Sequence, residues 1–177
     1  WWRAAKNLQA AIAAGLDPLK IVIDRAHEKD IQVIASLRIN DPGAPEGSNE
    51  NRYMLNRLKL EHPEYMIGEE DPVNPAVSTC LDFAINEVRQ ERLAVIEEVC
   101  DRYGADGLEI DDYVRIFFKP SEIKKNTPLL TDFVRSVREL LDNIGNKRGK
   151  RMFLSARIHP REDANLAVGM DVRSWVE

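Results

Sequence analysis

The apolar residues of this chain follow two spacings, one typical of helices and one typical of strands. In four segments they recur every three or four positions, which places them on one face of a helix. These segments are residues 2–14, 18–29, 86–103 and 127–144. In the second segment we expect Leu19, Val22 and Ala26 to form the buried face. Shorter helical stretches are predicted at 51–61 and within 161–177.

Capping residues predict where these helices begin and end. Asp17 followed by Pro18 is typical of a helix N-terminus, and Asn86 is expected to cap the helix that follows it. The last long helix is predicted to begin at residues 127–128, where a proline suits the first turn, and to end at Gly145.

Three shorter apolar runs, residues 31–37, 106–111 and 152–158, have the length of buried strands. They alternate with the helices, and this order predicts βαβ units and a parallel sheet, so the fold class is α/β. A long excursion follows the first run, with a polar loop at residues 40–50, the predicted helix at 51–61 and a second irregular region at 68–79. Three strands fit either an open α/β sheet or a section of a (β/α)8 barrel, because a whole barrel needs roughly 250 residues.

The composition is that of one globular domain, spanning residues 1–177, with 44% hydrophobic and 31% charged residues. The net charge of −5 argues against a nucleic-acid partner, because phosphate neutralisation needs a basic face. The basic run at 147–151 is expected to be a solvated turn. No apolar run approaches the roughly 18 residues that span a bilayer, so we predict no membrane span.

The chain begins with Trp1 rather than Met, and no signal peptide is visible. We therefore expect it to be a section of a longer protein, in which the signal for its compartment lies elsewhere.

The sequence contains no pattern that predicts a cofactor. A glycine-rich phosphate loop and a nucleophile elbow are both missing. Cys80 and Cys100 lack metal-binding spacing, and Cys100 lies on an apolar helix face, which predicts a core thiol rather than a disulfide. Glu109, Asp111 and His159 are suitable metal ligands, but no short-spaced motif supports a site, so we predict no metal.

Alternation along the central strand separates two faces. Leu108 and Ile110 are expected to pack under the helices, which turns Glu109 and Asp111 to the opposite face. Acids inside a strand are costly unless they are paired or used, and active sites of parallel barrels lie at the carboxyl ends of the strands. Asp111 is therefore the first candidate for a nucleophile or general acid/base, and Glu109 is expected to orient a partner or shift its pKa. Asp112 is a third acidic candidate, which is expected to tether the next loop. The alternative is that Asp111 and Asp112 are both ordinary turn residues after the strand.

The same alternation in the neighbouring strands turns Arg38, Arg157 and His159 toward these acids. The arginines are expected to pair with Glu109 or Asp111, either to bind substrate or to form a salt-bridge network that closes a barrel. His159 is interpreted as a polar contact residue or a proton carrier.

Aromatic residues are candidates for stacking on sugar rings or for the core. The candidates are Trp1, Trp2, Tyr113, Phe117 and Phe118.

The run from Tyr103 to Tyr113 reads Tyr-Gly-Ala-Asp-Gly-Leu-Glu-Ile-Asp-Asp-Tyr, and it resembles the glycoside-hydrolase-like proteins labelled family 10-like or DUF187-type. Glu109, Asp111 and Arg115 resemble a planctomycete-type subgroup of them, and so does the segment from Gly169 to Val176. This resemblance implies a partial TIM barrel, about half to two-thirds of the whole, in which the strands here are the third to fifth and Asp111 is the acid of the fourth. It also implies an exported bacterial protein.

Two departures from that resemblance affect substrate choice. The third strand ends in Ser36-Leu37-Arg38 where the family often has a Trp-x-Asn pair, and Glu109 replaces a histidine of the family.

We therefore expect a hydrolase of O-glycosidic bonds in a poly- or oligosaccharide, with Arg38, Tyr113, Arg115, Arg157, His159, Trp1 and Trp2 binding the carbohydrate. Glycosidases use two carboxyl groups, and we expect the second on a later strand beyond Glu177, so that residues 1–177 alone are inactive. The alternatives are a carbohydrate-binding or scaffold barrel without catalysis, and a metal-dependent lyase or isomerase.

Overall fold

The computed structural model describes residues 2–40, 42, 56–69, 75–111 and 116–176. Its helices are α1 (Trp2–Ala13), α2 (Pro18–His27), α4 (Arg57–Glu61), α5 (Asn86–Glu97), α6 (Ile123–Arg148), α7 (Glu162–Ala167) and α8 (Val172–Val176). Its strands are β1 (Ile34–Leu37), β2 (Gly107–Asp111) and β3 (Phe153–Arg157). Single helical turns lie at Pro63–Tyr65, Pro75–Thr79 and Pro120–Glu122, and a π-helical segment, Glu98–Arg102, extends α5.

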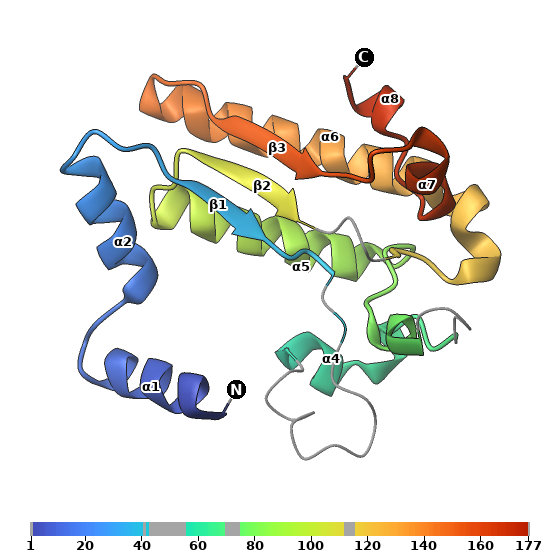
Figure 1. Ribbon diagram of the computed structural model, residues 1–177, viewed down its shortest axis with the longest axis horizontal. Coiled ribbons are helices and arrows are strands. Elements are labelled where there is room, and N and C mark those ends of the chain that lie inside the picture. The colour runs from blue at the N-terminus through green and yellow to red at the C-terminus, as the bar shows by residue number, and fades with distance from the viewer. Residues whose placement is uncertain (1, 41, 43–55, 70–74, 112–115, 177) are drawn as a thin grey trace.

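The three strands form one parallel sheet in the order β1-β2-β3, with β2 in the centre (Figure 1). Helices α5 and α6 lie behind the sheet in that view, while α1 and α2 lie to one side of it. The prediction of an α/β fold with parallel strands is confirmed.

The predicted alternation along β2 is also confirmed. Leu108 and Ile110 are buried in a core that includes Val88 and Ile96 of α5 and Val137 of α6. The side chains that alternate with them face away from these helices. The sheet therefore has one face covered by helices and one face that presents the candidate site.

Helix α6 is longer than the sequence predicted at both ends. It begins at Ile123, so Pro128 lies inside it rather than in its first turn, and it ends at Arg148 with Gly149 in a left-handed conformation (φ 67°). Gly145 is an interior residue of the helix. A Cβ on Gly145 would lie 2.5 Å from the Lys150 carbonyl oxygen, so this glycine permits close packing rather than ending the helix.

The predicted cap of α5 was wrong. Asn86 is the first helical residue, and the cap position belongs to Ile85, which makes no side-chain capping bond. The nearest side chain that accepts from the backbone is Asp82, which binds the Ala84 N–H at 2.9 Å in the turn before the helix.

Helix α2 has the predicted start, and its buried face differs from the prediction at one position. Asp17 accepts hydrogen bonds from the backbone of residues 19 and 20, and Pro18 occupies the first turn. Ile23 is 1% exposed, whereas Val22 is 59% exposed. Leu19 and Ala26 are partly buried, so the face agrees with the prediction except that Ile23 replaces Val22.

The basic run at 147–151 is more than a solvated turn. Arg148 donates to the backbone carbonyls of Cys100, Asp101 and Ala105, and so pairs carbonyl groups at and beyond the π-helical segment. Cys80 and Cys100 are both buried thiols, and burial raises the pKa of the Cys100 thiol to about 11, which agrees with a core thiol. No helix among the described residues has the length and apolar character needed to cross a membrane.

Candidate active site

The open face of the sheet is organised in three rows across β1, β2 and β3, set by the strand register. The first row is apolar, the second places an acid between two serines, and the third places an acid between two arginines. The rows are Ile34–Gly107–Phe153, then Ser36–Glu109–Ser155, then Arg38–Asp111–Arg157, with Arg38 one residue beyond the end of β1.

In the third row, Asp111 forms ion pairs with both arginines. Arg157 Nη1 lies 3.2 Å from Asp111 Oδ1, and Arg38 Nε lies 4.0 Å from Asp111 Oδ2. The Asp111 side chain is 14% exposed, whereas those of Arg38 and Arg157 are 65% and 51% exposed. The predicted convergence of two arginines on the strand-end acid is therefore observed.

In the second row, Ser36 Oγ donates a 2.8 Å hydrogen bond to Glu109 Oε1. Arg157 Nη2 lies 3.9 Å from the same oxygen, so one guanidinium group contacts both acids. The Glu109 side chain is 31% exposed, more than that of Asp111.

The first row needs a glycine in β2. A Cβ on Gly107 would lie 2.6 Å from Phe153 Cβ and 2.5 Å from the Phe153 carbonyl oxygen. The absence of a side chain therefore lets the neighbouring apolar residues approach each other below the acids.

His159 follows β3, and its backbone is fixed to α7. Its N–H donates to Asn165 Oδ1 at 2.8 Å, and its carbonyl accepts from Asn165 Nδ2 at 3.1 Å. The contacts described for this residue thus place it beside α7, and its predicted role toward the acids stays a prediction.

Several predicted site residues lie outside the described residues, namely Trp1, Asp112, Tyr113 and Arg115. Trp2 belongs to α1, but its side chain is not described. Phe117 and Phe118 are 1% and 0% exposed and belong to the core, so the core interpretation of these two rings holds and the stacking interpretation does not.

Sequence reasoning missed Asn40, which joins three segments at the carboxyl end of the sheet. Its Nδ2 donates to the carbonyls of Leu81 and Ile116 at 3.0 and 2.9 Å, and its Oδ1 accepts from the Leu81 N–H at 2.8 Å. The residue is 1% exposed. It therefore fixes the segments after β1 and β2 to each other, and no local pattern signals this role.

Asp106 was missed as an ionic centre at the opposite end of the sheet. It accepts from the Val33 N–H at 2.8 Å, lies 2.8 Å from His27 Nε2, and binds Lys150 Nζ. Burial alone would raise the pKa of Asp106, but the hydrogen bonds from Lys150, Val33 and His27 outweigh it and lower the pKa to about 2. This cluster stabilises the fold, because it lies at the amino ends of the strands.

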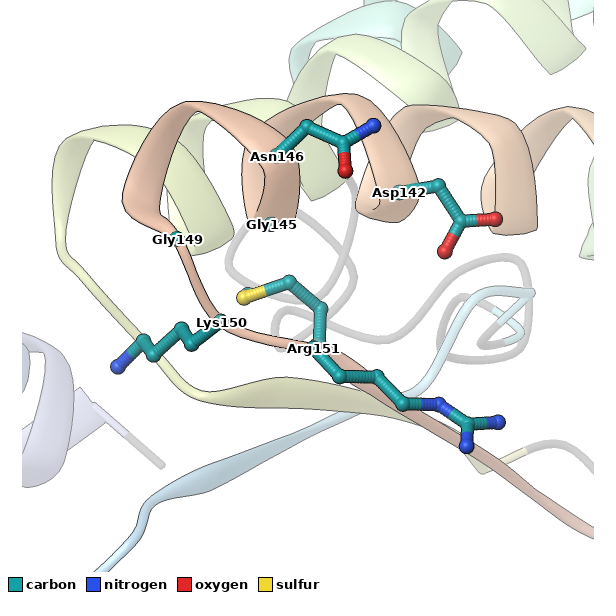
Figure 2. A pocket seen from close by; sticks show the side chains of 7 residues that line it. Asp142, Gly145, Asn146, Gly149, Lys150 and Arg151 are labelled. Carbon is teal, nitrogen blue, oxygen red and sulfur yellow. The ribbon is translucent and has the colours of Figure 1, made fainter.

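A surface hollow of about 390 Å³ also lies at the amino end of β3, where α6 turns into the strand (Figure 2). It is lined by Asp142, Gly145, Asn146, Gly149, Lys150, Arg151 and Met152. Its position away from the strand-end acids excludes it from the candidate site. No group of three potential metal ligands was found among the described residues.

The protein is thus an α/β protein with a parallel sheet, whose central strand presents two carboxyl groups at the end where parallel α/β enzymes carry their active sites. The family described as Glycosyl hydrolase-like 10 matches residues 2–127, which include β1, β2 and both acids. The chain belongs to this family, and the resemblance seen in the sequence is confirmed. No curated protein matches the chain.

Proposed function

We propose that this protein hydrolyses O-glycosidic bonds in a poly- or oligosaccharide, with Asp111 as nucleophile or general acid/base. The observation that carries this proposal is the third row, in which Asp111 lies at the carboxyl end of β2 between Arg38 and Arg157. Membership of a glycosyl hydrolase-like family supports the same chemistry.

We further propose that the sheet is part of a TIM barrel in which β2 is the fourth strand. Within the part of the chain that the structure describes, helices cover one face of the sheet, and polar side chains occupy the other face toward the carboxyl ends. This is the arrangement of a barrel wall, whose inner face carries the site at the strand ends. We also propose that the protein is exported, as the resemblance in its sequence implies.

The arginines of the third row are accessible enough to bind substrate while they pair with Asp111. Their side chains are more than half exposed while they pair with Asp111, and a guanidinium group carries five N–H donors. We assign them to substrate hydroxyl or acidic groups. We propose that the other carbohydrate contacts come from Tyr113, Arg115, His159, Trp1 and Trp2, with Asp112 as a further acidic residue of the site.

Replacement of Asp111 by Asn tests the proposal. The variant keeps the shape of the side chain but removes its charge, so we expect hydrolysis by the intact protein to fall at least about 100-fold. The measurement is reducing-end release from a panel of purified glycans, with Asp132→Asn as a matched surface control, because Asp132 is exposed on α6. Equal rates for the Asp111 variant and the wild type would rule out the catalytic role.

A second candidate function is carbohydrate binding without hydrolysis. It is favoured by the ion pairs of Asp111 with Arg38 and Arg157, which also suit a salt-bridge network that fixes strand ends together. Calorimetric titration with the same glycans separates the two. Binding without turnover by the wild-type protein supports this second function.

A further inference from the structure

We infer that Glu109 is the second carboxyl group of the proposed site and its proton donor, so that β2 supplies both acids of the reaction. This inference rests on the proposed glycosidase function and assigns a role that the sequence placed on a later strand.

The spacing of the two acids suits hydrolysis. Residues two apart on a strand share a face, and their Cα atoms lie about 6.6 Å apart. Glycosidases hold their two carboxyl groups about 5–10 Å apart. Arg157 contacts Asp111 at 3.2 Å and Glu109 at 3.9 Å, which shows that both carboxyl groups lie beside one guanidinium group.

Glu109 is also the more accessible of the two acids. Its flanking residues in the row are Ser36 and Ser155, which have small and exposed side chains. The two flanking positions of this row therefore leave space for a substrate beside the carboxyl group. The hydrogen bond from Ser36 Oγ involves Oε1 and fixes the orientation of the group.

The two acids differ in their neighbours, and this difference assigns one role in the reaction to each. Asp111 lies between two cationic guanidinium groups, which contact both of its carboxyl oxygens. Glu109 Oε1 accepts the hydrogen bond from Ser36 and lies 3.9 Å from Arg157, so Glu109 contacts one guanidinium group rather than two. We assign the role of nucleophile or base to Asp111, which is held from both sides, and the role of proton donor to the more accessible Glu109.

The reaction balances with these two groups and water. The carboxylic acid of Glu109 gives its proton to the glycosidic oxygen, and the bond from that oxygen to the anomeric carbon breaks with its electron pair on the oxygen. The oxygen of water bonds to the anomeric carbon, either directly, with one water proton passing to the Asp111 carboxylate, or after a glycosyl ester on Asp111, with that proton passing to Glu109. Proton exchange with solvent restores the starting state where needed.

Leaving-group dependence tests the assignment. A proton donor matters for an alkoxide leaving group and little for dinitrophenolate, which leaves without protonation. In the intact protein we expect Glu109→Gln to reduce kcat on an oligosaccharide by about 100- to 10,000-fold. On the 2,4-dinitrophenyl glycoside of the same sugar the loss in kcat/KM, which reports cleavage of the glycosidic bond and not the later hydrolysis of a glycosyl ester, should stay below about 10-fold. Asp111→Asn should slow both substrates alike, and near-normal turnover of the activated glycoside also shows that the Glu109 variant is folded.

Two results overturn the inference while leaving the proposed function intact. In one, Glu109→Gln hydrolyses the oligosaccharide as fast as the wild type. In the other, the kcat/KM of Glu109→Gln falls by the same factor on both substrates while its thermal unfolding is unchanged. A wild-type protein that hydrolyses neither substrate overturns both proposals.

Discussion

At the scale of single residues, the same side-chain type serves opposite purposes according to its position. Asp111 and Asp106 both belong to the segment 106–111, yet Asp111 lies among exposed arginines, whereas Asp106 is buried and joins segments that are distant in sequence. Asn40 is a third case, since a polar residue in a loop is 1% exposed and makes three hydrogen bonds to the backbone. Each role follows from the partners that the fold supplies.

Replacement of Asn40 by Ala should destabilise the protein by about 2–4 kcal/mol, because buried N–H and C=O groups of Leu81 and Ile116 lose their partner. The measurement is the free energy of unfolding in urea. Asn143 is exposed on α6 and is the matched control, with an expected change within about 0.5 kcal/mol for Asn143→Ala. A similar small change for Asn40→Ala would show that the loop segments do not depend on it.

At the scale of elements, α6 shows how a tertiary contact overrides a local signal. Pro128 and Gly145 are typical boundary residues, but the helix runs from Ile123 to Arg148. Buried positions such as Leu130, Phe133 and Leu141 recur at helical spacing along its whole length, and their burial outweighs one missing backbone bond at the proline.

Gly145→Ala should destabilise the protein by about 1–3 kcal/mol, although alanine is the better helix former, because the added Cβ would meet the Lys150 carbonyl at 2.5 Å. Thermal unfolding measures the effect. Gly149→Asn is the control, since that position has φ 67° and open space around it, and asparagine tolerates the left-handed conformation. An unchanged or raised Tm for Gly145→Ala contradicts the close approach.

At the scale of the whole molecule, Asp106 connects parts of the chain that are far apart in sequence. It binds His27 at the end of α2, Val33 before β1 and Lys150 before β3. One carboxylate therefore links three segments at the amino end of the sheet, whereas the candidate site lies at the carboxyl end.

The interactions of Asp106 predict that the free energy of unfolding depends on pH in the acidic range. The folded-state pKa of Asp106 is lowered from 3.8 to about 2, so its contribution is present above pH 4 and is lost as the pH falls toward 2. Asp106→Asn should lower the free energy of unfolding at pH 7 by about 2 kcal/mol and flatten its decrease between pH 4 and 2. Urea unfolding across this range measures both, with Asp132→Asn as an exposed control. An Asp106 variant with the same acid profile as the wild type contradicts the assignment.

Local sequence determined the parts of this protein that depend on periodicity. The alternation of Leu108, Glu109, Ile110 and Asp111 fixed which side chains face the helices, because successive residues of a strand point to opposite faces. The same rule predicts Arg38 and Arg157 beside Asp111, as the ion pairs confirm. The cap of α2 at Asp17 was equally local.

Only the tertiary structure decided how segments distant in sequence meet. The three rows require the register of β1, β2 and β3, and the roles of Asn40 and Asp106 require partners 41 to 79 residues away. The length of α6 and the exposure of Val22 likewise depend on what packs against each helix. The pattern of apolar residues shows which face of a helix or strand is apolar. Which segment packs against that face depends on packing and hydrogen bonds that form only when the whole domain folds.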